Sequence, residues 1–220
     1  MEPKEIEYPK KGEKIFIEGL KVEQTACVGW NGQLSQFWGY IEGYKNAGDV
    51  IIKEAIEDGT GLALDTLVFP TIFCYRQYLE LTLKYIIILG EIISTGQFSS
   101  IKGHGLKPLW VRCKIILDWY NEGKDKQFLN IIEEYILDFD TMDPNSVNFR
   151  YPIDKDGNPI HSNRKTIDLV NLRDRMNELY NFFDGCQHMI DHVNDNILEM
   201  KQIESELKRE IEQEMMGYWE

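Results

Sequence analysis

Apolar residues recur along most of this chain at intervals of three and four positions, which is the spacing of one face of an α-helix. The first such run begins near Gln33 and ends at the turn of Gly59, Thr60 and Gly61. Glycines inside this run lower its intrinsic helix propensity, so we expect the helix to pack closely against a neighbour. Its predicted apolar face comprises Leu34, Phe37, Ile41, Tyr44, Gly48, Ile51 and Ala55.

Apolar residues cover most of the circumference of a second predicted helix, which begins at Leu64 or Pro70 and ends near Leu89. This pattern is typical of a helix that is buried on most sides. A third helix is predicted after His104-Gly105. Three more are predicted over about 124–139, from Thr166 or Asp168 to Phe183, and over 187–216.

Two segments lack the helical spacing. Residues 13–30 alternate loosely between apolar and polar and predict a short hairpin or an irregular arm. Residues 140–166 contain several Pro and Gly positions, and we expect an irregular excursion with a small hairpin around Lys155–Asn158. The sequence therefore predicts an all-α fold with an arm over 1–32, a helical bundle over 33–186, and a long C-terminal amphipathic helix over 187–220 that packs on the bundle or projects from it.

Composition and charge narrow the class of protein. No apolar run approaches the roughly 20 residues of a membrane span, and the N-terminus lacks an apolar signal core. Four cysteines without paired spacing fit a reducing cytoplasm, so we expect a cytoplasmic protein without membrane contact, cofactor or metal. The net charge of −13 disfavours non-specific binding to nucleic acid. Residues 199–220 hold seven Glu against two Lys and one Arg, which suits a solvated helix that pairs with another chain.

Three charged residues follow one another at four-residue spacing on the second predicted helix: Arg76, Glu80 and Lys84. Burying such charges unpaired costs several kcal/mol, so their position needs an explanation. One interpretation is a thin solvent-facing stripe with ordinary pairing along the helix. The other is a polar groove in which Arg76 and Lys84 bind a nucleotide or an RNA phosphate.

Other polar residues suggest weaker sites. His104 precedes a helix and is interpreted as its cap, or as a general acid or phosphate contact. The stretch 149–175 carries six basic against four acidic residues with aromatic residues among them, a mixture found on surfaces that bind single-stranded RNA. Its binding candidates are Arg150, Tyr151, Arg164 and Lys165. The histidines and aspartates at 188–195 have metal-ligand spacing, but they lie opposite the apolar seam and are predicted to be solvated.

Two short motifs resemble the HEPN superfamily (higher eukaryotes and prokaryotes nucleotide-binding). The first is the run from Tyr75 to Lys84, and the second is the run from Gly103 to Trp110 that contains His104-Gly105-Leu106. The resemblance covers about residues 64–120, and the Phe149-Arg150-Tyr151-Pro152 segment is similar to an uncharacterised bacterial branch. It implies a HEPN-like helical bundle, often a homodimer, in prokaryotic defence or toxin–antitoxin systems.

The same resemblance bears on catalysis. Many members are metal-independent ribonucleases whose site pairs an Arg with a His about five residues later. The nearest match here is Arg175 followed by Tyr180. A phenol is a poor general base near neutral pH. The resemblance therefore implies a non-catalytic or degenerate protein that binds RNA, a nucleotide or a protein partner. The alternatives are a divergent ribonuclease using Arg175 with Tyr180 or His104, and a purely structural helical partner.

Overall fold

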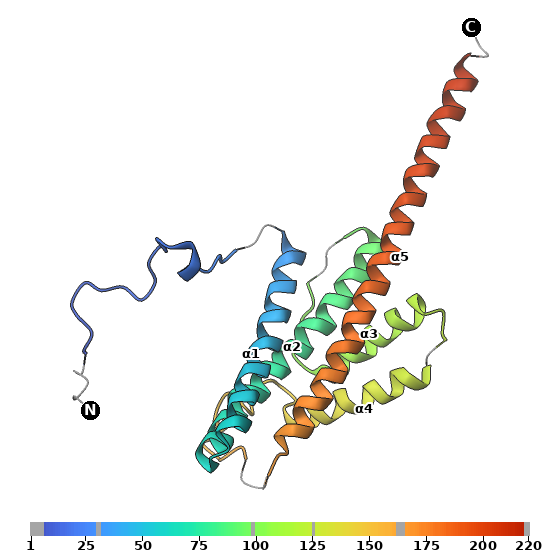
Figure 1. Ribbon diagram of the computed structural model, residues 1–220. Helices are drawn as coiled ribbons and strands as arrows, with labels where there is room; N and C mark the ends of the chain where they lie inside the picture. Colours follow the sequence, from blue (N-terminus) through green and yellow to red (C-terminus); the bar gives the residue numbers. More distant parts are fainter. Residues whose placement is uncertain (1–6, 30–31, 98–99, 125, 162–165, 218–220) are drawn as a thin grey trace. The chain divides into compact units, whose positions relative to one another are not determined.

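The computed structural model describes residues 7–29, 32–97, 100–124, 126–161 and 166–217. These residues contain five α-helices and one 3-10 turn, and the all-α prediction is confirmed (Figure 1). No helix among them is both long enough and apolar enough to span a membrane. The elements are the turn η1 (Val22–Gln24), α1 (Gln33–Asp58), α2 (Gly61–Thr95), α3 (Leu106–Tyr120), α4 (Lys126–Met142) and α5 (Leu169–Gly217).

The chain divides into two compact units, Met1–Gln36 and Phe37–Glu220. In the first unit, residues 7–29 are exposed throughout, with apolar side chains such as Ile15, Phe16 and Leu20 in contact with solvent. They contain the turn η1 and no paired strand. Of the two predicted forms for this segment, the described part is therefore an irregular arm and not a hairpin.

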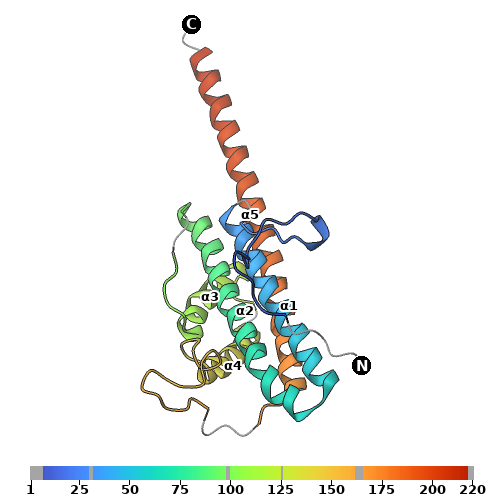
Figure 2. The same ribbon diagram turned by 90° about the vertical axis from the view of Figure 1, so that its left-hand side faces the viewer.

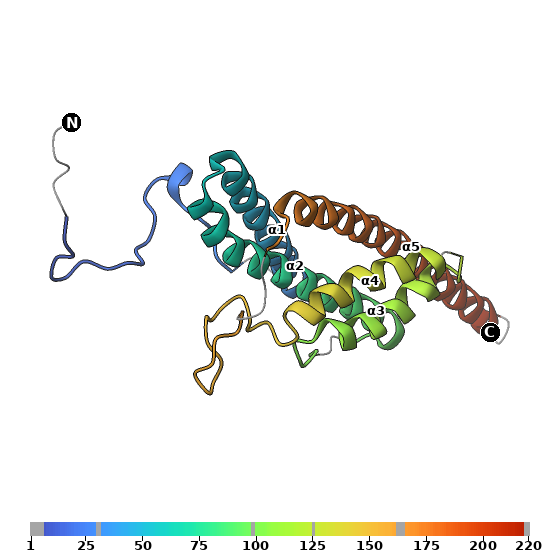
Figure 3. The same ribbon diagram turned by 90° about the horizontal axis from the view of Figure 1, so that it is seen from below.

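Helix α2 is the centre of the second unit, and its buried residues lie on nearly every side of it. It contacts α3 and α5, and α3 in turn contacts α4 and α5 (Figures 1 and 3). The helix begins earlier than predicted, at Gly61, where Thr60 Oγ1 accepts a hydrogen bond from the N–H of Ala63 at 3.2 Å. Pro70 lies inside the helix and has no N–H to donate to the carbonyl four residues earlier. The surrounding packing compensates for the free energy of this missing hydrogen bond.

Close packing holds the glycine-rich helix α1, as the sequence predicted. A Cβ atom on Gly48 would lie 2.5 Å from the ring of Tyr75 on α2, so only glycine fits at this helix crossing. Gly90 of α2 serves the same purpose against Ile116 of α3, where a Cβ would lie 2.8 Å from the side chain. Two glycines thus allow α2 to approach both neighbours closely.

The segment after α4 forms the predicted small hairpin. A β-bridge joins Ile153 to Pro159, and the N–H of Asp154 donates to the carbonyl of Asn158 at 2.9 Å. Gly157 lies in the turn with a φ of 86°, a conformation that glycine adopts without strain. Local turn residues therefore account for this structure.

Helix α5 differs from the prediction, which placed two helices over 168–183 and 187–216. The structure shows one continuous helix of 49 residues, so the predicted break between Phe183 and Gln187 is wrong. Apolar spacing continues through the glycine, because Phe183, Cys186 and Ile190 are all buried on the same side. One glycine inside a helix costs only about 1 kcal/mol, which this packing compensates. The C-terminal part of α5 extends past the other helices (Figures 1 and 2).

Candidate functional site

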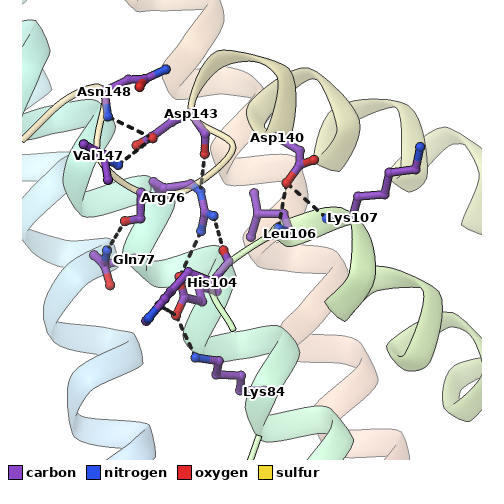
Figure 4. Close-up of polar contacts among 12 residues, drawn as sticks. Arg76, Gln77, Lys84, His104, Leu106, Lys107, Asp140, Asp143, Val147 and Asn148 are labelled. Atoms are coloured by element: carbon purple, nitrogen blue, oxygen red, sulfur yellow. Dashed lines mark hydrogen bonds and ion pairs between the residues drawn. The ribbon is translucent and has the colours of Figure 1, made fainter. Parts of the chain in front are cut away.

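The charged residues of the α2 stripe form a polar cluster with His104, and this cluster is buried at Arg76 and Glu80 and reaches solvent at Lys84 and His104 (Figure 4). Three parts of the chain meet there: the middle of α2, the loop that leads into α3, and the loop that follows α4. Helical spacing of four places the three α2 residues above one another on one face. The tertiary fold then brings the two loops onto that face.

Arg76 is the centre of this cluster, and its side chain has no exposed surface. Its Nε donates to the carbonyl of Asp143 at 3.2 Å, its Nη1 to Glu80 Oε2 at 3.3 Å, and its Nη2 to the carbonyl of His104. Burial lowers the pKa of the guanidinium, and the negative charges of Glu80 and Asp143 oppose that shift. Arg76 remains protonated near neutral pH because an arginine starts from a very high pKa.

Glu80 balances the positive charges of the cluster. Its carboxylate is almost fully buried, and Oε1 accepts a hydrogen bond from Lys84 Nζ at 2.7 Å. The same oxygen lies 2.9 Å from His104 Nδ1, while Oε2 receives Arg76. A single carboxylate therefore pairs with two buried or half-buried cations and orients an imidazole.

Neighbouring carboxylates secure the two loops. Asp143 Oδ1 accepts hydrogen bonds from the N–H groups of Val147 at 2.7 Å and Asn148 at 3.0 Å. Asp140 of α4 accepts from the N–H groups of Leu106 at 2.7 Å and Lys107 at 3.2 Å, which are orphan donors at the start of α3 (Figure 4). The cap of α3 thus comes from α4, and the prediction that His104 caps this helix is wrong.

Exposure decides between the two interpretations of the stripe. Arg76 and Glu80 are buried, so the solvent-facing stripe is wrong. Arg76 also has no surface from which to contact a ligand. Only Lys84, whose side chain is 13 % exposed, and His104, at 67 %, reach solvent. The arrangement is chiefly a structural clamp that fastens two loops to α2.

A second buried charge, which the sequence did not predict, lies on α1. Lys45 of α1 is 3 % exposed and donates to Asp49 Oδ2 at 2.6 Å and to Asn177 Oδ1 of α5 at 3.0 Å. Its ammonium also lies 5.0 Å from the ring centroid of Tyr180, within the range of a cation–π contact. The spacing of Lys45 could have indicated its burial, because it lies four positions after Ile41 and therefore on the same buried face of α1.

The three catalytic candidates do not meet. Arg175 donates to Glu178 Oε1 at 2.6 Å, and Glu178 also accepts from Tyr135 of α4 at 3.2 Å. Tyr180 instead points toward α1, with its hydroxyl 3.4 Å from the carboxylate of Glu42. Burial, followed by the charge of Glu42, raises the pKa of Tyr180. Even less of its basic phenolate form is therefore present near neutral pH. His104 lies at the α2 cluster.

The remaining RNA-binding candidates are partly described. The guanidinium of Arg150 lies 5.8 Å from the ring centroid of Phe73 and 5.4 Å from that of Tyr151, and both Arg150 and Tyr151 are exposed. Arg164 and Lys165 lie outside the described residues. In the described part of the chain no group of three or more His, Cys, Asp or Glu is placed to hold a metal ion.

Two cavities lie beside the start of α5. One, of about 420 Å³, separates α4 from α5 and is lined by Tyr135, Phe139 and Arg175. The other, of about 680 Å³, is lined by Phe69 and His161 together with the ends of α1 and α5. Tyr180 and His104 line neither cavity. These spaces therefore do not assemble the predicted catalytic residues.

Comparison with known proteins assigns no family to this chain. No family model, curated protein or solved structure matches it.

Proposed function

We propose that this chain is a non-catalytic helical binding protein, and that the C-terminal half of α5 pairs with a helix of another protein. One observation supports this proposal above the others. Four apolar side chains in this part of α5 are exposed by 50 to 63 % and recur at helical spacing. We call them the α5 seam, and they are Met200, Ile203, Leu207 and Ile211.

The seam lies beyond the bundle. The hydroxyl of Tyr120 in α3 donates to Asn194 Oδ1 at 2.7 Å, and Asn194 is the last α5 residue with a described polar contact to another helix. Ile190 is fully buried, whereas every seam residue is at least half exposed. The helix thus changes from core packing to solvent exposure within about three turns.

An unsupported amphipathic helix is marginally stable in water, because most helical stability comes from packing of the apolar face. Burying one aliphatic side chain of this size contributes about 1.5–3 kcal/mol. A partner helix that covers the four seam residues would therefore stabilise this half of α5 and remove its apolar surface from water.

The remaining functional alternatives have less support. Ribonuclease activity needs catalytic groups in contact, whereas Arg175 pairs with Glu178 of its own helix and Tyr180 points toward Glu42 of α1. RNA or nucleotide binding through Arg76 would need a guanidinium that reaches solvent, and this one has no exposed surface. Membership of the HEPN superfamily, homodimer formation and a role in prokaryotic defence remain proposals based on the motifs at 75–84 and 103–110. A cytoplasmic location remains a proposal based on the unpaired spacing of the cysteines.

A designed amphipathic peptide of about four heptads, with Leu and Ile at the seam positions and Gln at the flanking positions, provides the test. The full chain is expected to bind this peptide in a fluorescence anisotropy titration. Ile203→Asn with Leu207→Asn should weaken binding more than tenfold, since two buried aliphatic contacts are lost. Gln202→Asn with Ser205→Asn, on the opposite side of the same turns, is the matched control. Equal binding by both double variants would refute the proposal.

A further inference from the structure

We infer that the partner helix of the α5 seam is basic on both sides of its apolar face, and that a second copy of this chain is a poor occupant. This inference rests on the proposed function and names the chemistry of the partner. It follows from three glutamates that border the seam, Glu199, Glu204 and Glu206, all three of which are exposed.

The seam has a heptad register over its central part. Met200 and Leu207 are seven residues apart, and Ile203 lies between them, so the three take the a, a and d positions of a two-stranded coiled coil. In this register the e and g positions face the flanks of the partner helix. Glu199 and Glu206 occupy g positions, and Glu204 occupies an e position.

Every charged residue at these e and g positions from 199 to 206 is therefore a glutamate. The basic residues that follow this stretch, Lys208 and Arg209, take the b and c positions on the outer side of the helix. Charges at b and c do not reach across a two-stranded interface. The flanks of the seam consequently present negative charge to whatever binds there.

A second copy of this chain would meet these glutamates with its own. In a parallel pair, g faces e of the partner helix, which sets Glu199 against Glu204. In an antiparallel pair, g faces g, which sets Glu199 and Glu206 against each other. Like charges at such close positions are destabilising. The net charge of −13 on each chain adds long-range repulsion.

A helix with Lys or Arg at its e and g positions would replace each of these repulsions with an attraction. The long-range field of the acidic chain would also speed its approach, and this effect weakens as salt is added. Shape and charge together thus select a cationic amphipathic helix from another protein.

Three peptides with the same apolar positions test the inference against the full chain. They carry Lys, Gln or Glu at every e and g position, and their affinities are measured by fluorescence anisotropy at low and high NaCl. We expect the Lys peptide to bind about tenfold more tightly than the Gln peptide at low salt, and the Glu peptide to bind most weakly. The difference between the Lys and Gln peptides should shrink as salt is raised.

Two variants with equal changes in net charge provide the control. Glu199→Gln, Glu204→Gln and Glu206→Gln together should abolish the preference for the Lys peptide. Gln202→Lys, Ser205→Lys and Glu212→Gln raise the net charge by the same amount but lie at c and f positions, so this variant should keep the preference. Loss of preference in both variants would show that overall charge alone acts, and would overturn the inference.

The outcomes separate this inference from the proposed function. Equal affinity for the Lys, Gln and Glu peptides would overturn the basic partner and leave the helix-pairing function in place. Binding of none of the peptides would overturn both. Sedimentation equilibrium of the full chain gives a further result. Self-association that disappears in Leu207→Asn would identify a second copy as the occupant. It would overturn the inference and the assignment of the partner to another protein, while helix pairing through the seam would stand.

Discussion

The guanidinium Nε of Arg76 lies 3.2 Å from the carbonyl oxygen of Asp143, although the two residues are 67 positions apart in the chain. This hydrogen bond joins the middle of α2 to the loop that follows α4. The same guanidinium also binds the carbonyl of His104, in the loop before α3. One buried cation thus fastens two loops that no regular secondary structure would hold.

Arg76→Met should lower the free energy of unfolding by about 3–5 kcal/mol, because it leaves Glu80 buried with one cation fewer and two loop carbonyls without a donor. Urea denaturation measures this loss. Arg112→Met is the matched control, since Arg112 pairs with Glu91 at a partly exposed site where such pairs contribute about 1 kcal/mol or less. Similar losses in the two variants would contradict the clamp.

Gly48→Ala should destabilise the protein by about 1–3 kcal/mol, because the added Cβ would overlap the ring of Tyr75 and force α1 and α2 apart. Gly43→Ala on the same helix provides the contrast. A Cβ at Gly43 meets no atom within 4 Å, so alanine there should stabilise by about 0.5–1 kcal/mol. Thermal denaturation of the two variants should therefore show shifts of opposite sign.

Stability should fall in alkaline solution partly because of Tyr75. Burial, together with the hydrogen bond to Asp49, raises the pKa of this phenol well above its ordinary value near 10. Its contribution is therefore complete below about pH 10 and is lost as the pH rises further, because the unfolded chain ionises first. Tyr75→Phe should flatten the slope of unfolding free energy between about pH 10 and 11. An unchanged slope would exclude this cause.

Removal of residues 199–220 should leave the bundle folded. The last described polar contact between α5 and another helix is at Asn194, so the truncated chain keeps the core around Leu179, Phe183 and Ile190. We expect a cooperative thermal transition within a few degrees of the full chain, together with complete loss of peptide binding. Collapse of the transition would show instead that the projecting half of α5 belongs to the folding core.

The full chain should leave single-stranded RNA intact and purify without bound nucleic acid. The physical reasons are the separate environments of Arg175 and Tyr180 and the net charge of −13. Gel analysis after long incubation and the ratio of absorbance at 260 and 280 nm provide the two measurements. Cleavage that vanishes in Arg175→Ala would reinstate the ribonuclease alternative.

Features that depend only on residues close together in the chain could be predicted from the sequence. Helical spacing identified α1 and its end near Gly59, and turn residues identified the hairpin around Lys155–Asn158. The prediction divided α5 in two between Phe183 and Gln187. Gly185 lowers the local helix propensity there, but packing of Phe183 and Cys186 carries the helix through it.

Which polar residues are buried could not be predicted from the sequence, because burial depends on how the helices and loops pack. A helical pattern places Arg76, Glu80 and Lys84 on one face, but it does not reveal what covers that face. The covering loops supply His104, which is 28 positions from Arg76, and Asp143, which is 67 positions away. The hydrogen bond from Lys45 to Asn177, which lies 132 positions away, could not be predicted from the sequence for the same reason. Spacing along a helix is a local property, whereas burial of a charge depends on groups that folding brings together from distant parts of the chain.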